Sequence, residues 1–205
     1  MYRLIRSRIS IRFTPIYLIT FAAVLFAATT SAQVPTFQTT PQNSSIKFYV
    51  KASVALAGTF DGWTSALTFT SPDVTTGKLD INIDAASVNT GSGMKDGKLK
   101  SKDFFNVKEN PQITFRSSKV IQTGPYTFDV PGTFTIRGTS KPETLKLTIT
   151  GKGTGKGTIA GVMAFDRKDY GMDAGIPFVK IADRVEVTVD LKVQQTGGPK
   201  LIYQQ

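Results

Sequence analysis

The sequence contains no histidine and no cysteine, which restricts the chemistry that its side chains can perform. Serine–histidine and cysteine–histidine nucleophile systems are excluded, as are metal sites ligated by His or Cys. Carboxylate pairs remain at Asp80 and Asp84 and at Asp166 and Asp169, and such pairs can carry out acid–base hydrolysis. They fall on outward strand positions or in turns, where solvent reaches both carboxylates. We therefore expect no enzymatic activity.

The charge pattern gives little support to a nucleic-acid partner. The formal net charge is +10, but the basic residues form no dense run, so the surface favours anionic partners only weakly. The basic residues are also not interleaved with exposed aromatic side chains, as binding to single-stranded nucleic acid would require. We expect no nucleic-acid binding.

The elements that position these side chains are mainly strands. Apolar and polar residues alternate over 46–50, 79–83 and 185–193, the pattern of half-buried strands. Eight or so such segments, each with one apolar face, require a sandwich or a closed barrel. An outer-membrane barrel is a third possibility, but the polar face is dense in Lys, Asp and Glu and no terminal strand ends in an aromatic belt. An eight-stranded barrel has room for side chains or for one narrow ligand.

The alternation stops between Ser87 and Ser118. Turn-forming residues lead into a segment from Met94 to Phe105 that reads as a short helix, and Pro111 excludes a central strand before the alternation resumes. This segment inserts Leu99, Phe104 and Phe105 where the sheet is interrupted. We expect a plug at one end of the barrel, which either completes the core or forms one wall of an apolar cavity.

Residues 1–32 have the features of a secretory signal peptide. Four arginines precede an apolar core from Ile16 to Ala28, and small residues precede a cleavage point near Ala32. The core is too short for a permanent membrane span. The expected organisation is a signal peptide (1–32), an extended lead-in (33–44), a barrel (45–195) and a flexible tail (196–205). We expect the mature protein to be soluble and periplasmic or secreted.

Several motifs follow one another along the chain: Ser87-Val88-Asn89-Thr90-Gly91, Lys95-Asp96 with Leu99, Lys102-Asp103-Phe104-Phe105, Asn110-Pro111 to Phe115, Gly132 to Pro142, and Asp166 to Gly171. Together they resemble the YceI-like family of secreted bacterial lipid-binding proteins. The likeness extends over most of the predicted mature chain. The resemblance implies an all-β fold, an antiparallel eight-stranded lipocalin-like barrel with a short helical plug between strands. It also implies a long-chain ligand such as a polyisoprenoid or an isoprenoid quinone. The chain departs from the family at Lys98, where the pattern typically has histidine.

The candidate site residues follow from the inward faces and from the resemblance. Aromatic residues on an inward face usually pack a core, and the resemblance favours ligand contact for some of them. The candidate apolar lining comprises Phe48, Phe60, Trp63, Phe69, Met94, Leu99, Phe104, Phe105, Phe115, Phe134 and Phe165. The candidates for binding a polar head group are Lys95, Asp96, Lys98, Arg137 and Arg167.

These observations predict an exported binding protein that holds or carries a long apolar molecule, with no cofactor and no metal. The alternative is a secreted structural or stress-related barrel whose interior is filled by its own side chains. If the protein carries such a ligand, we also expect transient contact with a membrane. The sequence leaves the identity of the ligand and the formation of a homodimer open.

Overall fold

The computed structural model describes residues 33–53, 56–175 and 178–204; the signal peptide predicted over 1–32 lies outside them. In the described region the chain forms a twelve-stranded sheet and one α-helix, α1 (Gly93–Lys100). The strands are β1 (Thr36–Thr39), β2 (Ser45–Ala52), β3 (Leu56–Phe60), β4 (Trp63–Thr68), β5 (Lys78–Asp84), β6 (Val88–Asn89), β7 (Gln112–Ser117), β8 (Ile121–Gln122), β9 (Thr127–Ile136), β10 (Thr139–Thr150), β11 (Lys156–Asp166) and β12 (Ile181–Gly197). The 3-10 helices are η1 (Pro41–Asn43), η2 (Val74–Thr76), η3 (Ala85–Ser87) and η4 (Arg167–Tyr170).

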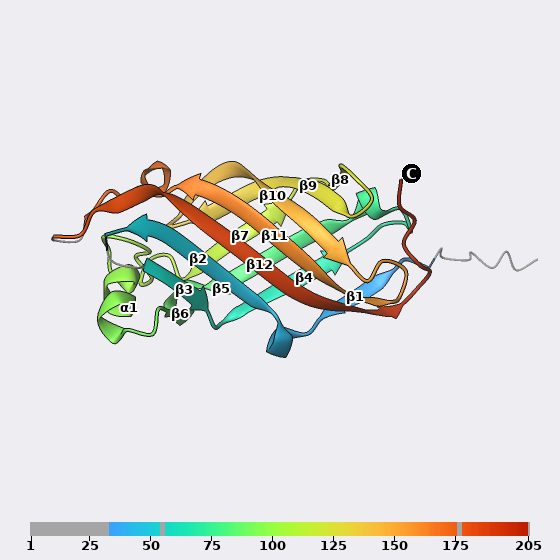
Figure 1. The fold of residues 1–205 in the computed structure, drawn as a ribbon, viewed down its shortest axis with the longest axis horizontal. Coiled ribbons are helices and arrows are strands. Elements are labelled where there is room, and N and C mark those ends of the chain that lie inside the picture. The colour runs from blue at the N-terminus through green and yellow to red at the C-terminus, as the bar shows by residue number, and fades with distance from the viewer. Residues whose placement is uncertain (1–32, 54–55, 176–177, 205) are drawn as a thin grey trace, which may run out of the picture. The chain divides into compact units, whose positions relative to one another are not determined.

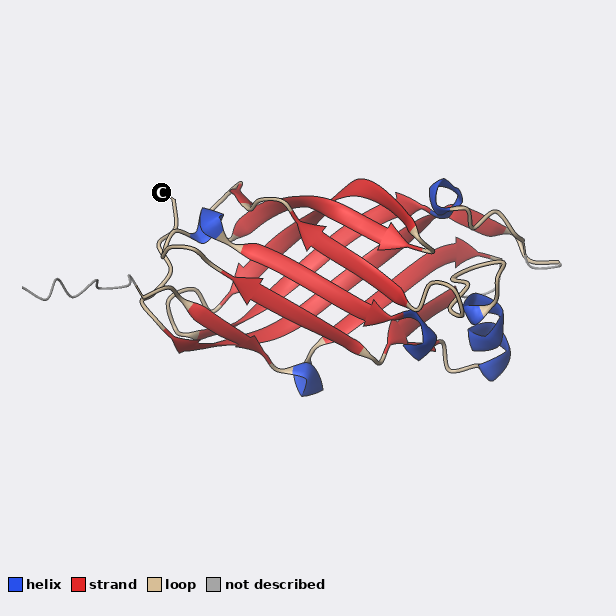
Figure 2. Ribbon diagram, turned by 180° about the vertical axis from the view of Figure 1, so that it is seen from behind, coloured by secondary structure: helices blue, strands red, loops and turns tan. Residues whose placement is uncertain are grey.

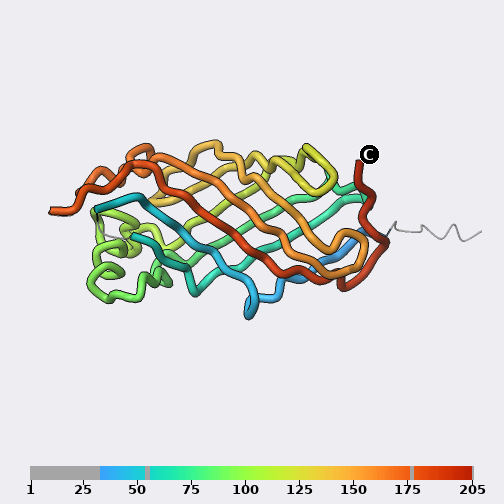
Figure 3. The backbone as a smooth tube through the Cα atoms, in the orientation of Figure 1, coloured from blue at the N-terminus to red at the C-terminus, as the bar shows by residue number. Residues whose placement is uncertain are grey.

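The sheet is antiparallel and curls into a half-barrel (Figure 1). Its strand order is β4-β5-β7-β9-β10-β11-β12-β2-β3-β6, with β1 added to β12 and β8 added to β9. The long strand β12 pairs with β11 on one side and with β2 and then β1 on the other. The tube drawing in Figure 3 shows these long strands crossing the front of the sheet as one continuous layer. The predicted all-β fold with a short helix between strands is confirmed, with more strands than the eight expected.

The additional strands are short and carry weak sequence signals. β1, β6 and β8 have four, two and two residues, too few for alternation to be recognised. The long strands follow the expected period of two: Leu79, Ile81 and Ile83 of β5 are buried, whereas the residues between them are partly exposed.

Strand β9 continues through Pro131 and Gly132, where the sequence indicates a break. Pro131 pairs with Thr144 of β10, and its carbonyl accepts the amide of Ser118 (2.9 Å). On its other edge β9 exchanges β8 for β7 at this point, so the missing proline amide falls where the partner strand changes. A Cβ at Gly132 would lie 2.5 Å from the Arg116 carbonyl oxygen. Glycine therefore permits the close approach of β7.

The segment after β6 forms the expected helix, although α1 ends at Lys100 rather than Phe105. The following turns carry Phe104 and Phe105, which are buried together with Leu99. Seen from behind, the helices lie at the periphery of the sheet, with α1 at one end and the C-terminus at the other (Figure 2). We call these the plug end and the tail end.

One hydrophobic core runs through the described barrel. It joins inward residues of the long strands with the plug residues Leu99, Phe104 and Phe105. None of the helices in the described part of the chain has the length and hydropathy needed to cross a lipid bilayer.

Candidate ligand-binding cavity

An apolar cavity of about 100 Å³ lies inside the tail end of the barrel. Strands β4, β5, β9, β10, β11 and β12 supply its walls, and β1, a loop and the C-terminal residues supply the rest. Its lining residues are Phe37, Leu67, Phe69, Val74, Gly77, Leu79, Val120, Phe128, Val130, Leu147, Ile149, Thr150, Gly151, Gly153, Gly155, Lys156, Gly157, Thr158, Ile159, Val193, Gln195, Lys200, Leu201 and Tyr203. The cavity is apolar because every second residue of a strand points inward, and in these strands those residues are mostly apolar.

Cross-strand pairing brings the wall residues into register. Leu147 of β10 pairs with Phe128 of β9, and Ile149 of β10 pairs with Ile159 of β11. Directly paired side chains on one sheet face are close neighbours, so these residues form a continuous apolar surface. Phe69 packs against Phe37 of β1, with ring centroids 5.6 Å apart.

Residues 198–204, which we call the strap, fold back along the tail end. The Ile202 amide donates to the Pro72 carbonyl (2.8 Å), and the Val74 amide donates to the Ile202 carbonyl (3.0 Å). Gln204 exchanges two hydrogen bonds with the Gln122 side chain, of 2.8 and 2.9 Å. This arrangement places Leu201 and Tyr203 in the cavity wall. The flexibility expected of residues 196–205 stays a prediction.

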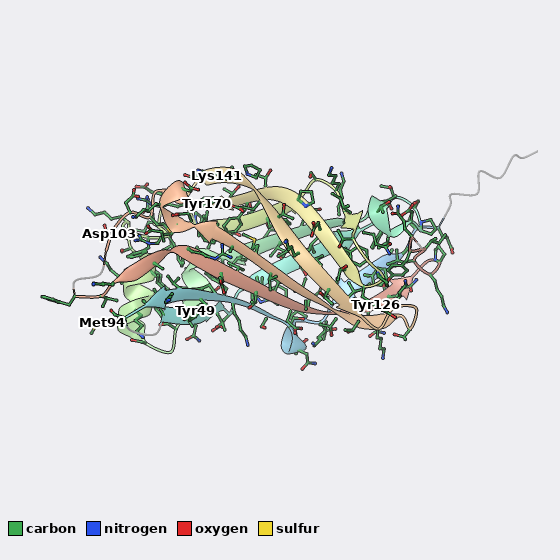
Figure 4. The ribbon with its side chains drawn as sticks, turned by 45° about the horizontal axis from the view of Figure 1, so that its top comes forward. Tyr49, Met94, Asp103, Tyr126, Lys141 and Tyr170 are labelled. Atoms are coloured by element: carbon green, nitrogen blue, oxygen red, sulfur yellow. The ribbon has the colours of Figure 1, made fainter. Side chains whose placement is uncertain are left out.

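Tyr203 links the strap to the loop between β10 and β11. Its ring packs near Phe128 at 6.4 Å between centroids, and the Lys152 ammonium lies 4.3 Å from the ring centroid. Lys152 also lies over Tyr126, at 5.6 Å. Burial raises the pKa of the Tyr203 phenol, so the ring lines the cavity as a neutral group. Figure 4 shows Tyr126 at the tail end, far from Met94 and Asp103 at the plug end.

Glycines shape the loop over residues 151–157. Gly151, Gly153 and Gly155 have φ angles of +75°, +80° and +77°, in the left-handed region that favours glycine. A Cβ on Gly151 would lie 2.0 Å from the Lys156 carbonyl oxygen. The loop therefore holds a tight conformation at the cavity mouth.

The plug end is packed by aromatic rings. Phe60 lies between Phe48 and Phe105, with centroid distances of 5.7 and 5.8 Å. Phe134 lies beside Phe165 (5.1 Å), and both contact Tyr170. The side chains of this group are almost fully buried, so they fill the interior at this end.

Among the residues predicted to form the apolar lining, Phe69 lies at the cavity. Phe48, Phe60, Leu99, Phe104, Phe105, Phe115, Phe134 and Phe165 are buried in the core away from it, and Trp63 packs against that core with part of its surface exposed. Met94 differs from its expected place on the interior wall, because its side chain is 87% exposed. It follows the helix start on the solvent side, whereas Leu99 faces the core. Contact of the plug residues with a ligand stays a prediction.

The predicted head-group residues of the helix take part in local structure. The Lys98 ammonium forms an ion pair with Asp103 (2.6 Å), and this hydrogen bond lowers the pKa of the Asp103 carboxyl. Asp96 accepts hydrogen bonds from the Thr90 hydroxyl (2.7 Å) and amide (2.8 Å), which lower its pKa. Lys95 lies on the same helix, partly buried. The bonds of Asp96 and Lys98 hold α1 and its adjoining turns in place.

The two predicted arginines connect segments at the plug end. Arg137 donates to the carbonyls of Gly171 and Lys102, the latter at 2.9 Å. Its backbone sits at φ +53° in a two-residue turn with Gly138, which has φ +73°; these angles suit a tight hairpin. The turn explains the side chain's direction, across the end of the barrel.

Arg167 is buried, with 6% of its surface exposed. It donates to the carbonyls of Met172, Ala174 (3.0 Å) and Ala182 (3.3 Å) and forms an ion pair with Asp183 (3.0 Å). The guanidinium thereby ties η4 to the start of β12. The planar guanidinium carries several N–H donors in a fixed geometry, so one arginine can bond all of these oxygen acceptors.

Sequence reasoning missed most of the cavity. The strap residues Leu201 and Tyr203 follow Gly197-Gly198-Pro199 and carry no periodic signal, and Phe37 lies in a lead-in rich in Thr, Pro and Gln. Phe128 was recognisable as an inward aromatic residue, but nothing in the sequence distinguishes it from Phe134 on the same strand. The described residues contain no cluster of three or more acidic side chains suited to a metal ion.

Comparisons with known proteins agree on a family. The YceI-like domain model matches residues 37–193. A UPF0312 protein of Pseudomonas aeruginosa is 32% identical over 143 residues, covering 65% of this chain and 74% of the relative. The crystal structure of Burkholderia cenocepacia BcnA matches with a TM-score of 0.69 at 26% identity, covering 76% of this chain and 99% of BcnA.

A polyisoprenoid-binding domain of Saccharophagus degradans, implicated in plant cell wall breakdown, has a similar fold. Its TM-score is 0.62 at 18% identity, over 78% of this chain and 99% of that domain. The strap lies beyond the residues that the family model matches.

Proposed function

We propose, since the chain belongs to the YceI-like family, that it binds a long-chain apolar molecule with the tail-end cavity as its site. A polyisoprenoid or an isoprenoid quinone is the expected class of ligand. The observation that carries the proposal is the cavity itself, an apolar space bounded by Phe69, Phe128 and Leu147 beside the packed hydrophobic core of the barrel.

The cavity volume limits how much of a long chain fits without rearrangement. An engineered apolar cavity of about 150 Å³ binds benzene, so about 100 Å³ corresponds to a segment of a few carbons. Burial contributes about 0.8 kcal/mol per methylene, so about four methylenes give about 3 kcal/mol, which corresponds to a dissociation constant above about 1 mM. Tight binding therefore requires more of the chain to be enclosed. The strap residues Leu201 and Tyr203 occupy the space next to the cavity, and their displacement would enlarge it.

We infer binding without catalysis. The carboxylates that could act as acid and base are engaged in local structure: Asp84 and Asp166 accept the amides of Ala86 and Lys168, each at 2.9 Å, and Asp169 forms an ion pair with Lys141 (3.3 Å). Asp80 sits on β5 opposite Arg116. None of the four lines the cavity.

We further propose that the protein is exported to the periplasm or secreted, on the strength of the signal-peptide features of residues 1–32. Transient contact with a membrane would then supply and receive the ligand. Determination of the N-terminus of the mature protein tests export; recovery of the intact chain in the membrane fraction would refute it.

The alternative function is a barrel without a ligand. The packed aromatic rings at the plug end favour this reading for that half of the interior. Native mass spectrometry of the purified protein, followed by organic extraction, separates the two. We expect an extractable apolar molecule bound in stoichiometric amount. A folded, extracted protein that fails to take up a polyisoprenoid would support the ligand-free barrel.

A further inference from the structure

The cavity mouth carries positive charge. Lys156, at the end of the glycine-rich loop, and Lys200, in the strap, are the charged residues among those that line the cavity, and both are exposed. Lys152 projects from the same loop and lies over the Tyr203 ring. No carboxylate residue is among the lining residues.

The lysines at the cavity mouth are not paired with carboxylates in the described part of the chain. Within the described ranges of the chain, Lys152, Lys156 and Lys200 form no ion pair, whereas Lys98 and Arg167 at the plug end are paired with Asp103 and Asp183. Asp73, which forms a β-bridge with Ile202 of the strap, accepts the Thr75 amide (2.8 Å) and hydroxyl (2.7 Å) with its carboxylate. Lys152 lies over the rings of Tyr126 and Tyr203 and donates to the Pro125 carbonyl (3.4 Å). Lys156 and Lys200 are therefore the cations of the cavity mouth that are open to a partner outside the chain.

We propose that the tail-end mouth recognises a negatively charged head group, a carboxylate or a phosphate, of an amphiphile whose tail enters the cavity. This inference rests on the proposed function. An anion close to Lys156 and Lys200 satisfies charges that the protein leaves unpaired, while the apolar tail meets Phe128 and Leu147. A ligand with an uncharged head group would gain only the apolar contacts of its tail. At the plug end, by contrast, the predicted head-group residues Lys98, Arg137 and Arg167 bind protein groups.

The test compares ligands that differ in the head and share the tail. Delipidated protein is titrated with dodecanoic acid, dodecyl phosphate and dodecanol, each below its aggregation threshold. Inorganic phosphate is titrated as well, because it has the charge of a head group and no apolar tail. Binding is measured by displacement of a neutral fluorescent probe at low and at high salt. The variants are Lys156→Gln and Lys200→Gln. Lys47→Gln, on the exposed side of β2, is the control with the same change of charge.

We expect both anionic ligands to bind more tightly than dodecanol. Each mouth variant should weaken anion binding by about two- to fivefold at low salt, less at high salt, and leave dodecanol binding and the Lys47 control unchanged. Equal affinity for dodecanol and the anions, an equal effect of Lys47→Gln, or equally tight binding of phosphate alone would overturn the inference. Failure of all three chain ligands to bind to folded protein would instead overturn the proposed function.

Discussion

Strand β9 offers a matched test of where the ligand binds. Phe128 and Phe134 lie on this strand with both side chains directed inward and nearly fully buried. Phe128 lines the cavity, whereas Phe134 packs against Phe165 (5.1 Å) and Tyr170 (5.6 Å) in the filled part of the core. Truncation of each to alanine changes the same atoms on the same strand, so the difference reports on the surroundings.

The expected effects on stability differ in size. A buried Phe→Ala substitution costs roughly 3–5 kcal/mol, depending on the void it leaves. Phe134→Ala should fall toward the upper end, because it also loses two aromatic contacts of about 0.5–1.5 kcal/mol each. Phe128→Ala should fall toward the lower end, because one side of its ring already borders empty space. Urea unfolding of the ligand-free variants gives these values from the shift in midpoint.

The expected effects on binding differ in kind. Phe128→Ala enlarges the cavity, so each further methylene of dodecanol that enters should tighten binding by about fourfold. Phe134→Ala should leave the dissociation constant within about twofold of the parent. The affinity is measured by probe displacement and independently by the stabilisation that a saturating ligand gives, about 2.7 kcal/mol at one hundred times the dissociation constant. If Phe134→Ala changed affinity as much as Phe128→Ala in folded protein, the ligand would lie toward the plug end and our assignment of the cavity would be wrong.

Three further predictions concern the two ends of the barrel. Removal of the chain from residue 198 onward should accelerate association of dodecanol in stopped-flow measurements while the protein stays folded; an unchanged association rate would exclude the strap from the access route. Arg167→Met should lower the free energy of unfolding by roughly 3 kcal/mol or more, because it leaves buried carbonyls without donors, and Arg167→Lys should not restore the parental urea midpoint. The hydrogen bond from Lys168 lowers the pKa of Asp183 from its usual 3.8, so the stability this carboxylate contributes is fully present above that pH and lost as the pH falls below it. Asp183→Asn should therefore flatten the acid limb of a pH–stability curve, and an unchanged limb would contradict this assignment.

Much of the fold follows from sequence pattern. Alternation in β5 and β12 identifies strands and their inward faces, because burial of one face imposes a period of two. The turn residues after Ser87, followed by a short polar segment with Leu99, indicate the helix. The interruption expected at Pro131 was wrong because a proline's missing donor is harmless where a strand changes its partner, and strand partners are a tertiary property.

The site was less predictable for a different reason. Alternation shows that Phe128 and Phe134 both point inward, but whether an inward residue touches a neighbour or a void depends on the volumes brought in by several other strands. The structural roles of Arg137 and Arg167 could not be predicted from the sequence either. Their hydrogen-bond acceptors are backbone carbonyls, which every residue has, so no residue type signals them.

The plug and the strap, at opposite ends of the barrel, differ in the contacts that must break before each end can open. The plug connects β6 to β7 and supplies Leu99, Phe104 and Phe105 to the core, so its displacement would remove buried aromatic rings and pull on both strands. The strap follows β12 and is held to the rest of the barrel mainly by hydrogen bonds and by the packing of Leu201 and Tyr203. Its hydrogen bonds are those of its backbone to Pro72 and Val74, the two between Gln204 and Gln122, and the two from the Gln195 side chain to the Gly198 and Pro199 carbonyls. Together they amount to roughly 3–9 kcal/mol at 0.5–1.5 kcal/mol each. Such a segment can detach while the strand ladders stay intact, since local opening is cheapest where few buried contacts are broken. A ligand that must pass in and out of the barrel therefore meets the lower barrier at the end that holds the cavity.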